Sequence, residues 1–176
     1  MSMYPKCGPL LEACEMFEKL LVQDVISWTA MISVYAQVGH IEESICLFSA
    51  MQDNGISPNE ITYVNMLSAC SHEGKVEEGI HYFMSVCKDH SRKPTSQHYG
   101  CLIDLYARAG RLDEAEIILN NSEVRTNALI WQTLLGACRF HDDVERGKRA
   151  AEYVIKLDPL ISASYVALSD FYVHDV

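Results

Sequence analysis

The chain has 176 residues, of which 49% are hydrophobic and 22% are charged, and its formal net charge is −10. This composition is typical of a folded domain, and the length suffices for one continuous stacked core. No run of eighteen apolar residues is present, which excludes a membrane-spanning helix. The acidic charge predicts weak phosphate-driven affinity for nucleic acid, unless Lys6, Arg108 and their neighbours line one groove.

A ten-residue phrase recurs along the chain. "YAQVGHIEES" at 35–44 returns as "YARAGRLDEA" at 106–115, and two further copies share its glycine. These glycines are 31, 35 and 36 residues apart, at Gly8, Gly39, Gly74 and Gly110. A fifth copy, "CRFHDDVERG" at 138–147, has Asp142 in place of glycine. Periods of this length are typical of helical solenoids.

Within one period the apolar spacing predicts helix, turn, helix. Before the turn, residues spaced i, i+3, i+4, i+7 are Trp28, Met31, Ile32 and Tyr35, and the matching set after it is Ile41, Ile45, Phe48 and Met51. Gly39 supplies the left-handed conformation that closes the first helix. We therefore predict an all-α fold, a right-handed α-solenoid of nine or ten antiparallel helices in stacked helix-turn-helix repeats.

Both ends of the chain fall inside a repeat. "MSMYPKCGPLLEA" enters the repeat phase partway through a first helix, and "SYVALSDFYVHDV" stops inside one. We expect a segment of a longer array, with self-association through the apolar faces at its two ends.

Seven cysteines lie at scattered helical positions with no CxxC spacing. Cys70 and Cys138 occupy equivalent places, in "LSAC" and "LGAC", which indicates repeat architecture and not ligand geometry. We expect reduced packing residues, no metal site and no cofactor, and a reducing compartment.

The phrases "DVISWTAMISVYAQVGHIEESICLFSAMQDNGISPNEITYVNMLSACSHEGKVEEGIHYF" and "HYGCLIDLYARAGRLDEAEIIL" resemble plant organellar pentatricopeptide repeat (PPR) proteins of the PLS subclass. "NALIWQTLLGACRFHDDVERGKRAAEYVIKLDP" resembles the E-type motifs that follow the last repeats. The resemblance implies these divisions: a partial S-type repeat at 1–24, a P-type repeat at 25–59, an L-type repeat at 60–95, an S-type repeat at 96–127, a first E-type motif at 128–161 and a partial second E-type motif at 162–176.

The same resemblance implies sequence-specific recognition of single-stranded RNA, one base per repeat, in cytidine-to-uridine editing of organellar transcripts. It implies a mitochondrial or chloroplast location, with a targeting peptide upstream of these residues. Its implied protein partners are multiple organellar RNA-editing factors and a DYW-type deaminase. The residues leave open a protein–protein interaction scaffold with little RNA binding of its own. A tetratricopeptide-like version of that scaffold fits less well, because tetratricopeptide repeats keep a period of 34 residues.

The resemblance places the base-reading pair of the complete repeat on Thr29 and Asn59, a combination that the family's code assigns to adenine. Asn59 carries an amide that donates and accepts, and Thr29 a hydroxyl that can do either, so the pair can complement adenine. Ile26 and Ile61 are implied to clamp the base faces. From residue types alone, Thr29 is a helix-start residue and Asn59 a turn residue beside Pro58.

The remaining reading positions are weaker candidates. Val64 and Thr95 form one pair, in which an apolar side chain cannot hydrogen-bond a base edge. Gly100 and Asn127 form another, in which glycine removes one of the two polar groups. Asp24 remains from the first repeat, since its partner position precedes Met1.

One tripeptide has the letters of a catalytic motif. "HIE" at 40–42 matches the first half of the zinc-deaminase signature, yet the PCxxC half is missing from the sequence. No nucleophile, base and orienting residue form a recognisable set either. We predict that the chain is not an enzyme.

Overall fold

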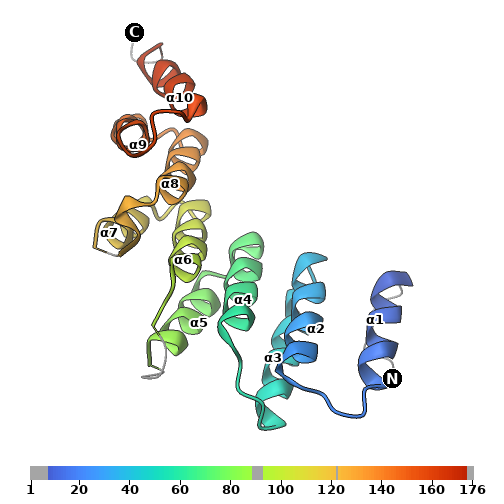
Figure 1. The fold of residues 1–176 in the computed structure, drawn as a ribbon. Helices are drawn as coiled ribbons and strands as arrows, with labels where there is room; N and C mark the ends of the chain where they lie inside the picture. The colour runs from blue at the N-terminus through green and yellow to red at the C-terminus, as the bar shows by residue number, and fades with distance from the viewer. Residues whose placement is uncertain (1–7, 89–92, 122, 174–176) are drawn as a thin grey trace. The chain divides into compact units, whose positions relative to one another are not determined.

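The computed structural model describes residues 8–88, 93–121 and 123–173, which form ten α-helices and one short 3₁₀ helix (Figure 1). These described residues contain no strand, which confirms the all-α prediction. The chain divides into two compact units, residues 1–86 and 87–176. The right-handed sense of a superhelix concerns both units together and stays a prediction.

The first unit contains helical hairpins joined by short turns. Its helices are α1 (Gly8–Glu18), α2 (Val25–Gln37), α3 (Ile41–Asp53), α4 (Glu60–Glu73) and α5 (Val76–Lys88), the last of which crosses the boundary between the units. Helix α2 packs against α3, its partner in the hairpin, and against α4, the first helix of the next hairpin (Figure 1). First helices therefore line up beside first helices, as in a solenoid.

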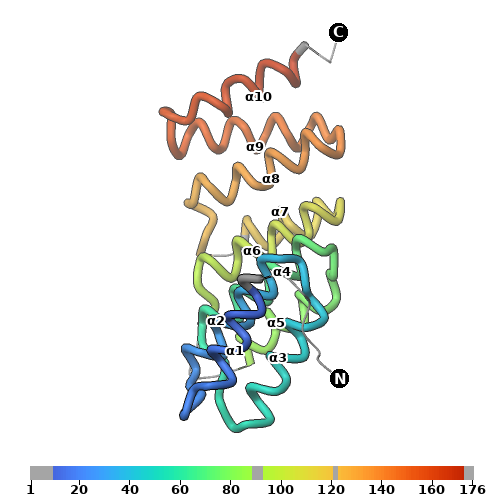
Figure 2. The backbone as a smooth tube through the Cα atoms, turned by 90° about the vertical axis from the view of Figure 1, so that its right-hand side faces the viewer, coloured from blue at the N-terminus to red at the C-terminus, as the bar shows by residue number. Residues whose placement is uncertain are grey.

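The second unit repeats this arrangement. Its helices are α6 (Ser96–Arg108), α7 (Leu112–Asn121), the 3₁₀ helix η1 (Glu123–Thr126), α8 (Ala128–Phe140), α9 (Val144–Leu157) and α10 (Ser162–Val173). Helices α8, α9 and α10 lie in successive contact, and α6 packs against α8 (Figure 2). Among the described residues, the helices of the different repeats do not differ in a way that would separate P-type, L-type, S-type and E-type repeats. These divisions therefore stay predictions.

The turns between paired helices depend on one residue with positive φ. Gly39 has φ of 78°, and the N–H of His40 donates to the Tyr35 carbonyl at 3.0 Å, which closes α2 in a Schellman motif. Asp142 replaces glycine in the fifth copy and still adopts φ of 57°, with the same bond from Asp143 to Cys138 at 2.9 Å. Aspartate tolerates this conformation better than most residues, so the turn survives without glycine.

The core lies where the helices of a unit face one another. Ile32, Met51 and Leu67 are completely buried in the first unit, as are Ile103, Leu119 and Leu134 in the second. Aromatic contacts add to the burial: the Phe48 and Tyr82 rings meet edge to face with centroids 5.0 Å apart. Within each unit the first helices therefore pack against the second helices through this core, which positions the side chains on the opposite face of the first helices.

Candidate nucleic-acid interface

Each predicted last-position residue lies at the N-cap of a first helix. Asp24 caps α2, Asn59 caps α4, Thr95 caps α6 and Asn127 caps α8. An N-cap side chain supplies the acceptor that the first helical N–H groups lack, which explains why these positions carry Asp, Asn or Thr. At Asp24, the bond from the Ser27 backbone N–H holds the pKa of the carboxyl below its ordinary value.

The predicted pair Thr29 and Asn59 is brought together through a third residue that the sequence analysis did not single out. The Oγ1 atoms of Thr29 on α2 and Thr62 on α4 are 2.7 Å apart. Thr62 also donates to Asn59 Oδ1 at 2.9 Å, and the Thr62 backbone N–H donates to the same oxygen at 2.9 Å. Thr29 and Thr62 are buried and Asn59 is half-buried. A polar chain of three side chains therefore joins two adjacent first helices.

Two large aliphatic side chains lie exposed at the same ends of these helices. Ile26 on α2 is 71% exposed and Ile61 on α4 is 60% exposed. Exposure on this scale is unusual for isoleucine and leaves two apolar surfaces on adjacent first helices. The predicted clamp residues are thus accessible to a flat apolar ligand such as a nucleobase.

The corresponding place in the second unit is apolar. Gly100 on α6 offers no side chain, and a Cβ added there would meet Ile130 Cδ1 at 3.8 Å. Asn127 Oδ1 accepts from the Leu129 backbone N–H at 3.0 Å. Leu129, at the position equivalent to Ile61, is 70% exposed and was missed by the sequence analysis, although its place in the register could have identified it. This second site has an apolar clamp residue and one polar side chain.

The members of the weaker candidate pair, Val64 and Thr95, belong to different units, so neither unit alone contains the pair. Val64 is half-buried on α4 of the first unit, and Thr95 is half-buried at the start of α6 in the second. Thr95 contacts His98, whose Nδ1 lies 2.8 Å from Thr95 Oγ1 and accepts from the Thr95 backbone N–H at 3.1 Å.

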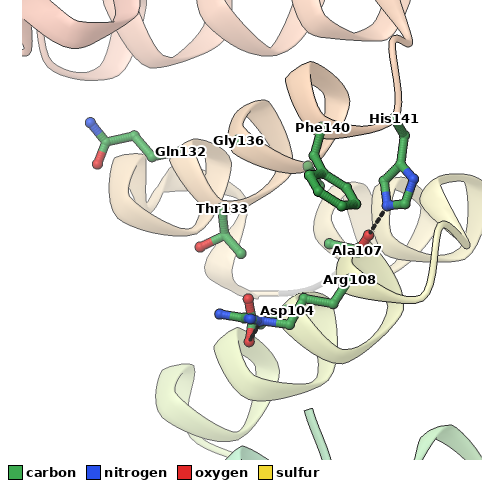
Figure 3. Close-up of a pocket in the computed structure, with 9 residues that line it drawn as sticks. Asp104, Ala107, Arg108, Gln132, Thr133, Gly136, Phe140 and His141 are labelled. Atoms are coloured by element: carbon green, nitrogen blue, oxygen red, sulfur yellow. Dashed lines mark hydrogen bonds and ion pairs between the residues drawn. The ribbon is translucent and has the colours of Figure 1, made fainter. Parts of the chain in front are cut away.

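An open pocket of about 500 Å³ lies between α6 and α8 (Figure 3). Arg108 in its wall donates from Nε to Asp104 Oδ2 at 2.9 Å, so its charge is partly neutralised. Phe140 is 80% exposed, and His141 Nε2 lies 3.0 Å from the Ala107 carbonyl oxygen (Figure 3). The equivalent pocket between α2 and α4, of about 570 Å³, has neither Lys nor Arg among its described lining residues. Of these two pockets, only the α6–α8 pocket has a described basic lining residue, Arg108, and Lys6 lies outside the described residues.

Acidic residues gather in the first turns of the second helices, where a helix N-terminus favours negative charge. Two of them, Glu42 and Asp113, pair with the next repeat. Lys75 contacts Glu42 in the first unit, and Arg146 in the second contacts Asp113 and Glu116, the latter from Nε at 2.7 Å. These pairs connect successive hairpins, and the carboxylates that point outward give the second helices a solvated, acidic face.

The histidine of the "HIE" tripeptide makes contacts with residues close to it in the sequence. His40 lies at the N-cap position of α3, its Nδ1 is 3.6 Å from Glu43 Oε1, and its ring meets Tyr35 edge to face. Within the described residues, no three His, Cys, Asp or Glu side chains come together as a metal site would require, and no helix is long and apolar enough to cross a bilayer.

Comparison with known proteins shows which family these hairpins represent. A PPR repeat family model matches residues 23–72, and a PPR repeat model matches residues 61–89 and 98–122. A pentatricopeptide repeat-containing protein of Arabidopsis thaliana is 44% identical over 174 residues, which cover 99% of this chain and 28% of that protein. A chloroplastic and a mitochondrial Arabidopsis member are 44% and 42% identical, over 97% and 95% of this chain. The chain spans 20% and 22% of those two relatives.

Solved structures share the fold. Maize PPR10 in complex with an 18-nt psaJ RNA element superposes with a TM-score of 0.74 at 19% identity, over 92% of this chain and 24% of that one. The PPR domain of Arabidopsis thaliana protein-only RNase P 1 in complex with tRNA gives 0.74 at 15% identity, over 94% and 91% of the two chains. With repeat models matched over residues 23–89 and 98–122, and hairpins of the same kind in both units, the chain belongs to the pentatricopeptide repeat family.

Proposed function

We propose that this chain is a single-stranded RNA-recognition segment of a plant organellar RNA-editing factor, in which helices α2 and α4 read one adenine. The observation that carries the proposal is the meeting of Thr29 and Asn59, side chains of adjacent first helices, through Thr62. Ile26 and Ile61 lie exposed beside them. One polar pair flanked by two apolar surfaces is suited to a base, which is polar at its edge and apolar on its faces.

The family relationship supports RNA as the ligand. Two of the structural neighbours are complexes, one with an RNA element and one with tRNA. Two relatives that share more than 40% identity are a chloroplastic and a mitochondrial protein. The editing role rests on the resemblance of residues 128–161 to E-type motifs and is proposed on that ground.

The charge of the chain sets an expectation for affinity. Residues 1–87 contain three Lys or Arg and eleven Asp or Glu. Phosphate contacts normally supply most of the nonspecific affinity, so binding by this segment should be weak and should depend on the reading site. In a longer array, neighbouring repeats would supply the remaining affinity.

A second candidate function is supported by the second unit. Leu129 is 70% exposed, Phe140 80% and Leu160 92%, while the α6–α8 site lacks the polar pair. Exposed large apolar side chains on a folded surface favour contact with a protein. On this proposal the second unit docks organellar editing factors or a DYW-type deaminase, and the first unit reads RNA.

Fluorescence anisotropy with labelled hexauridine RNAs, each carrying one adenine, guanine or cytosine at successive positions, tests the proposal at low ionic strength. We expect the tightest binding when adenine occupies one particular position. Equal binding of every RNA, or binding only in the presence of an editing-factor protein, would contradict base reading and favour the docking function.

A further inference from the structure

We infer that Thr62 is a positioning residue that fixes which atom of the reading pair donates a hydrogen bond and which accepts. The inference rests on the proposed function and specifies how the α2–α4 site distinguishes adenine from guanine. It follows from the hydrogen-bonding capacity of three side chains that meet at Thr62 Oγ1.

The hydroxyl proton of Thr62 can be donated to only one of its partners. Thr62 Oγ1 has three partners: the Asn59 backbone nitrogen at 3.1 Å, Asn59 Oδ1 at 2.9 Å and Thr29 Oγ1 at 2.7 Å. A backbone N–H can only donate and a carbonyl oxygen can only accept. Thr62 therefore accepts from the Asn59 backbone and donates its single proton to Asn59 Oδ1.

Thr29 must then donate to Thr62. A hydroxyl has one proton and two acceptor lone pairs, and the proton of Thr62 is already committed to Asn59. The 2.7 Å contact between the two hydroxyls can form only if Thr29 supplies the hydrogen. What remains of the Thr29 hydroxyl for a ligand is an acceptor lone pair.

The orientation of the Asn59 amide is fixed by the same contacts. The Thr62 backbone N–H and the Thr62 hydroxyl both point at one terminal atom of Asn59, so that atom must be the oxygen. With Oδ1 occupied twice, the Nδ2 group is left to face a ligand as a donor. The reading pair thus offers one donor, on Asn59, and one acceptor, on Thr29.

This polarity matches adenine and opposes guanine. Adenine presents a donor at N6 and an acceptor at N1, which meet the Thr29 oxygen and the Asn59 amide hydrogen respectively. Guanine placed in the same way would set its O6 acceptor against the Thr29 oxygen and its N1–H against the Asn59 donor. If the Thr29 hydroxyl were free to rotate, it could donate to O6 and the first of these repulsions would disappear. Thr62 prevents that rotation.

The second unit lacks the chain of hydroxyl groups that joins Thr29, Thr62 and Asn59. There the equivalent positions are Gly100, Ile130 and Asn127, and neither of the first two has a hydroxyl. The Asn127 oxygen is held by a single backbone bond, from Leu129 at 3.0 Å. No hydroxyl sets a polarity at this site.

Substitution of Thr62 in the full chain tests the inference, with the single-base hexauridine RNAs as probes. We expect the parent to prefer adenine over guanine by about fivefold or more. Thr62→Val has nearly the same shape but no hydroxyl, and should bring the ratio close to one. Thr62→Ser restores the hydroxyl and should restore the preference. If Thr62→Val loses its helical circular dichroism, Thr62→Cys replaces it with the same expectation, because a thiol is a weak hydrogen-bond donor.

A matched control separates positioning from stability. Ser44 is completely buried in α3, and its hydroxyl bonds to backbone carbonyl oxygens, those of His40 at 3.2 Å and Ile32 at 3.4 Å. Ser44→Ala should lower stability while keeping the adenine preference. An unchanged preference in Thr62→Val would overturn the inference and leave the proposed function intact. Equal binding of adenine and guanine RNAs by the parent would instead overturn the proposed function, and the inference with it.

Discussion

The α2–α4 site of the first unit and the α6–α8 site of the second occupy equivalent places and differ in polarity. In the first, Thr29, Thr62 and Asn59 form a continuous hydrogen-bonded chain between two helices. In the second, Gly100 and Ile130 replace both threonines, and the remaining polar residue serves only its own helix. The hairpin scaffold is common to both, so under the proposed function the difference in base reading between the two sites lies in two hydroxyl groups and not in the fold.

The largest expected effect is a change of base preference on Asn59→Asp. The carboxylate keeps the capping oxygen but turns the outward donor into an acceptor, which suits the N1–H and N2–H groups of guanine. At about 1 to 3 kcal/mol per side-chain and base contact, we expect the adenine-to-guanine affinity ratio to change by about tenfold or more. Competition among the single-base RNAs measures the ratio.

Asn127→Asp is the control in the second unit, since the same substitution there has no hydroxyl partner. It should leave the preference of the first site unchanged. If Asn59→Asp, like Asn127→Asp, left the base preference unchanged, Asn59 would be only a capping residue.

A transplant of the two hydroxyls should make the sites more alike. Gly100 has room for a side chain, because a Cβ would lie 3.8 Å from the nearest Ile130 atom. We expect Gly100→Thr combined with Ile130→Thr to create a second position with an adenine preference of about fivefold, measured with RNAs carrying two adenines at varied spacing. Gly100→Ala with Ile130→Val is the apolar control, and an equal gain in that control would show that the hydroxyls are irrelevant.

The caps should differ in their contribution to stability. Asn59 Oδ1 accepts two hydrogen bonds and Asn127 Oδ1 accepts one. Loss of an N-cap side chain costs about 0.5 to 2 kcal/mol, and we expect Asn59→Ala near the upper end and Asn127→Ala near the lower end. Urea denaturation gives both free energies of unfolding, and a larger loss for Asn127→Ala would contradict the difference.

The smallest expected effect concerns the reactivity of buried cysteine thiols, in which the two units should not differ. Burial raises the pKa of the Cys70 thiol and of the Cys138 thiol to about 12. At pH 8 both remain protonated, and only the thiolate reacts, so both should resist alkylation while the exposed Cys46 is modified. Mass spectrometry after timed iodoacetamide treatment measures this, and rapid labelling of Cys70 or Cys138 would show that its unit opens readily.

Much of the fold could be predicted from the sequence because it depends on local patterns. The spacing of Trp28, Met31, Ile32 and Tyr35 predicts α2, and Gly39 predicts its end. Asp142 stands where the other copies of the repeated phrase have glycine. Its left-handed backbone conformation explains how the turn forms there without glycine. Periodicity and turn chemistry act within a few residues, so one sequence suffices to detect them.

The site was predicted less completely because it depends on contacts between repeats. Thr29 and Thr62 are 33 positions apart, and no local pattern indicates that their hydroxyls meet. From residue type alone the Thr29 hydroxyl could donate or accept, whereas the contacts of Thr62 leave it only an acceptor role. Leu129 was overlooked although it occupies the register position of Ile61, and its exposed fraction of 70% is close to the 71% of Ile26.

The central claim is that Asn59 contacts the base while Asn127 does not, and the side-chain amide signals of these two residues test it directly. We would record ¹⁵N–¹H spectra of the uniformly labelled chain, assign both NH₂ groups through Asn→Asp variants, and titrate with the adenine-bearing hexauridine RNA that binds best. The account predicts that the Asn59 NH₂ signals shift in proportion to binding and that the Asn127 signals stay in place. Shifts at Asn127 alone, or binding that leaves both amides unchanged, would contradict it.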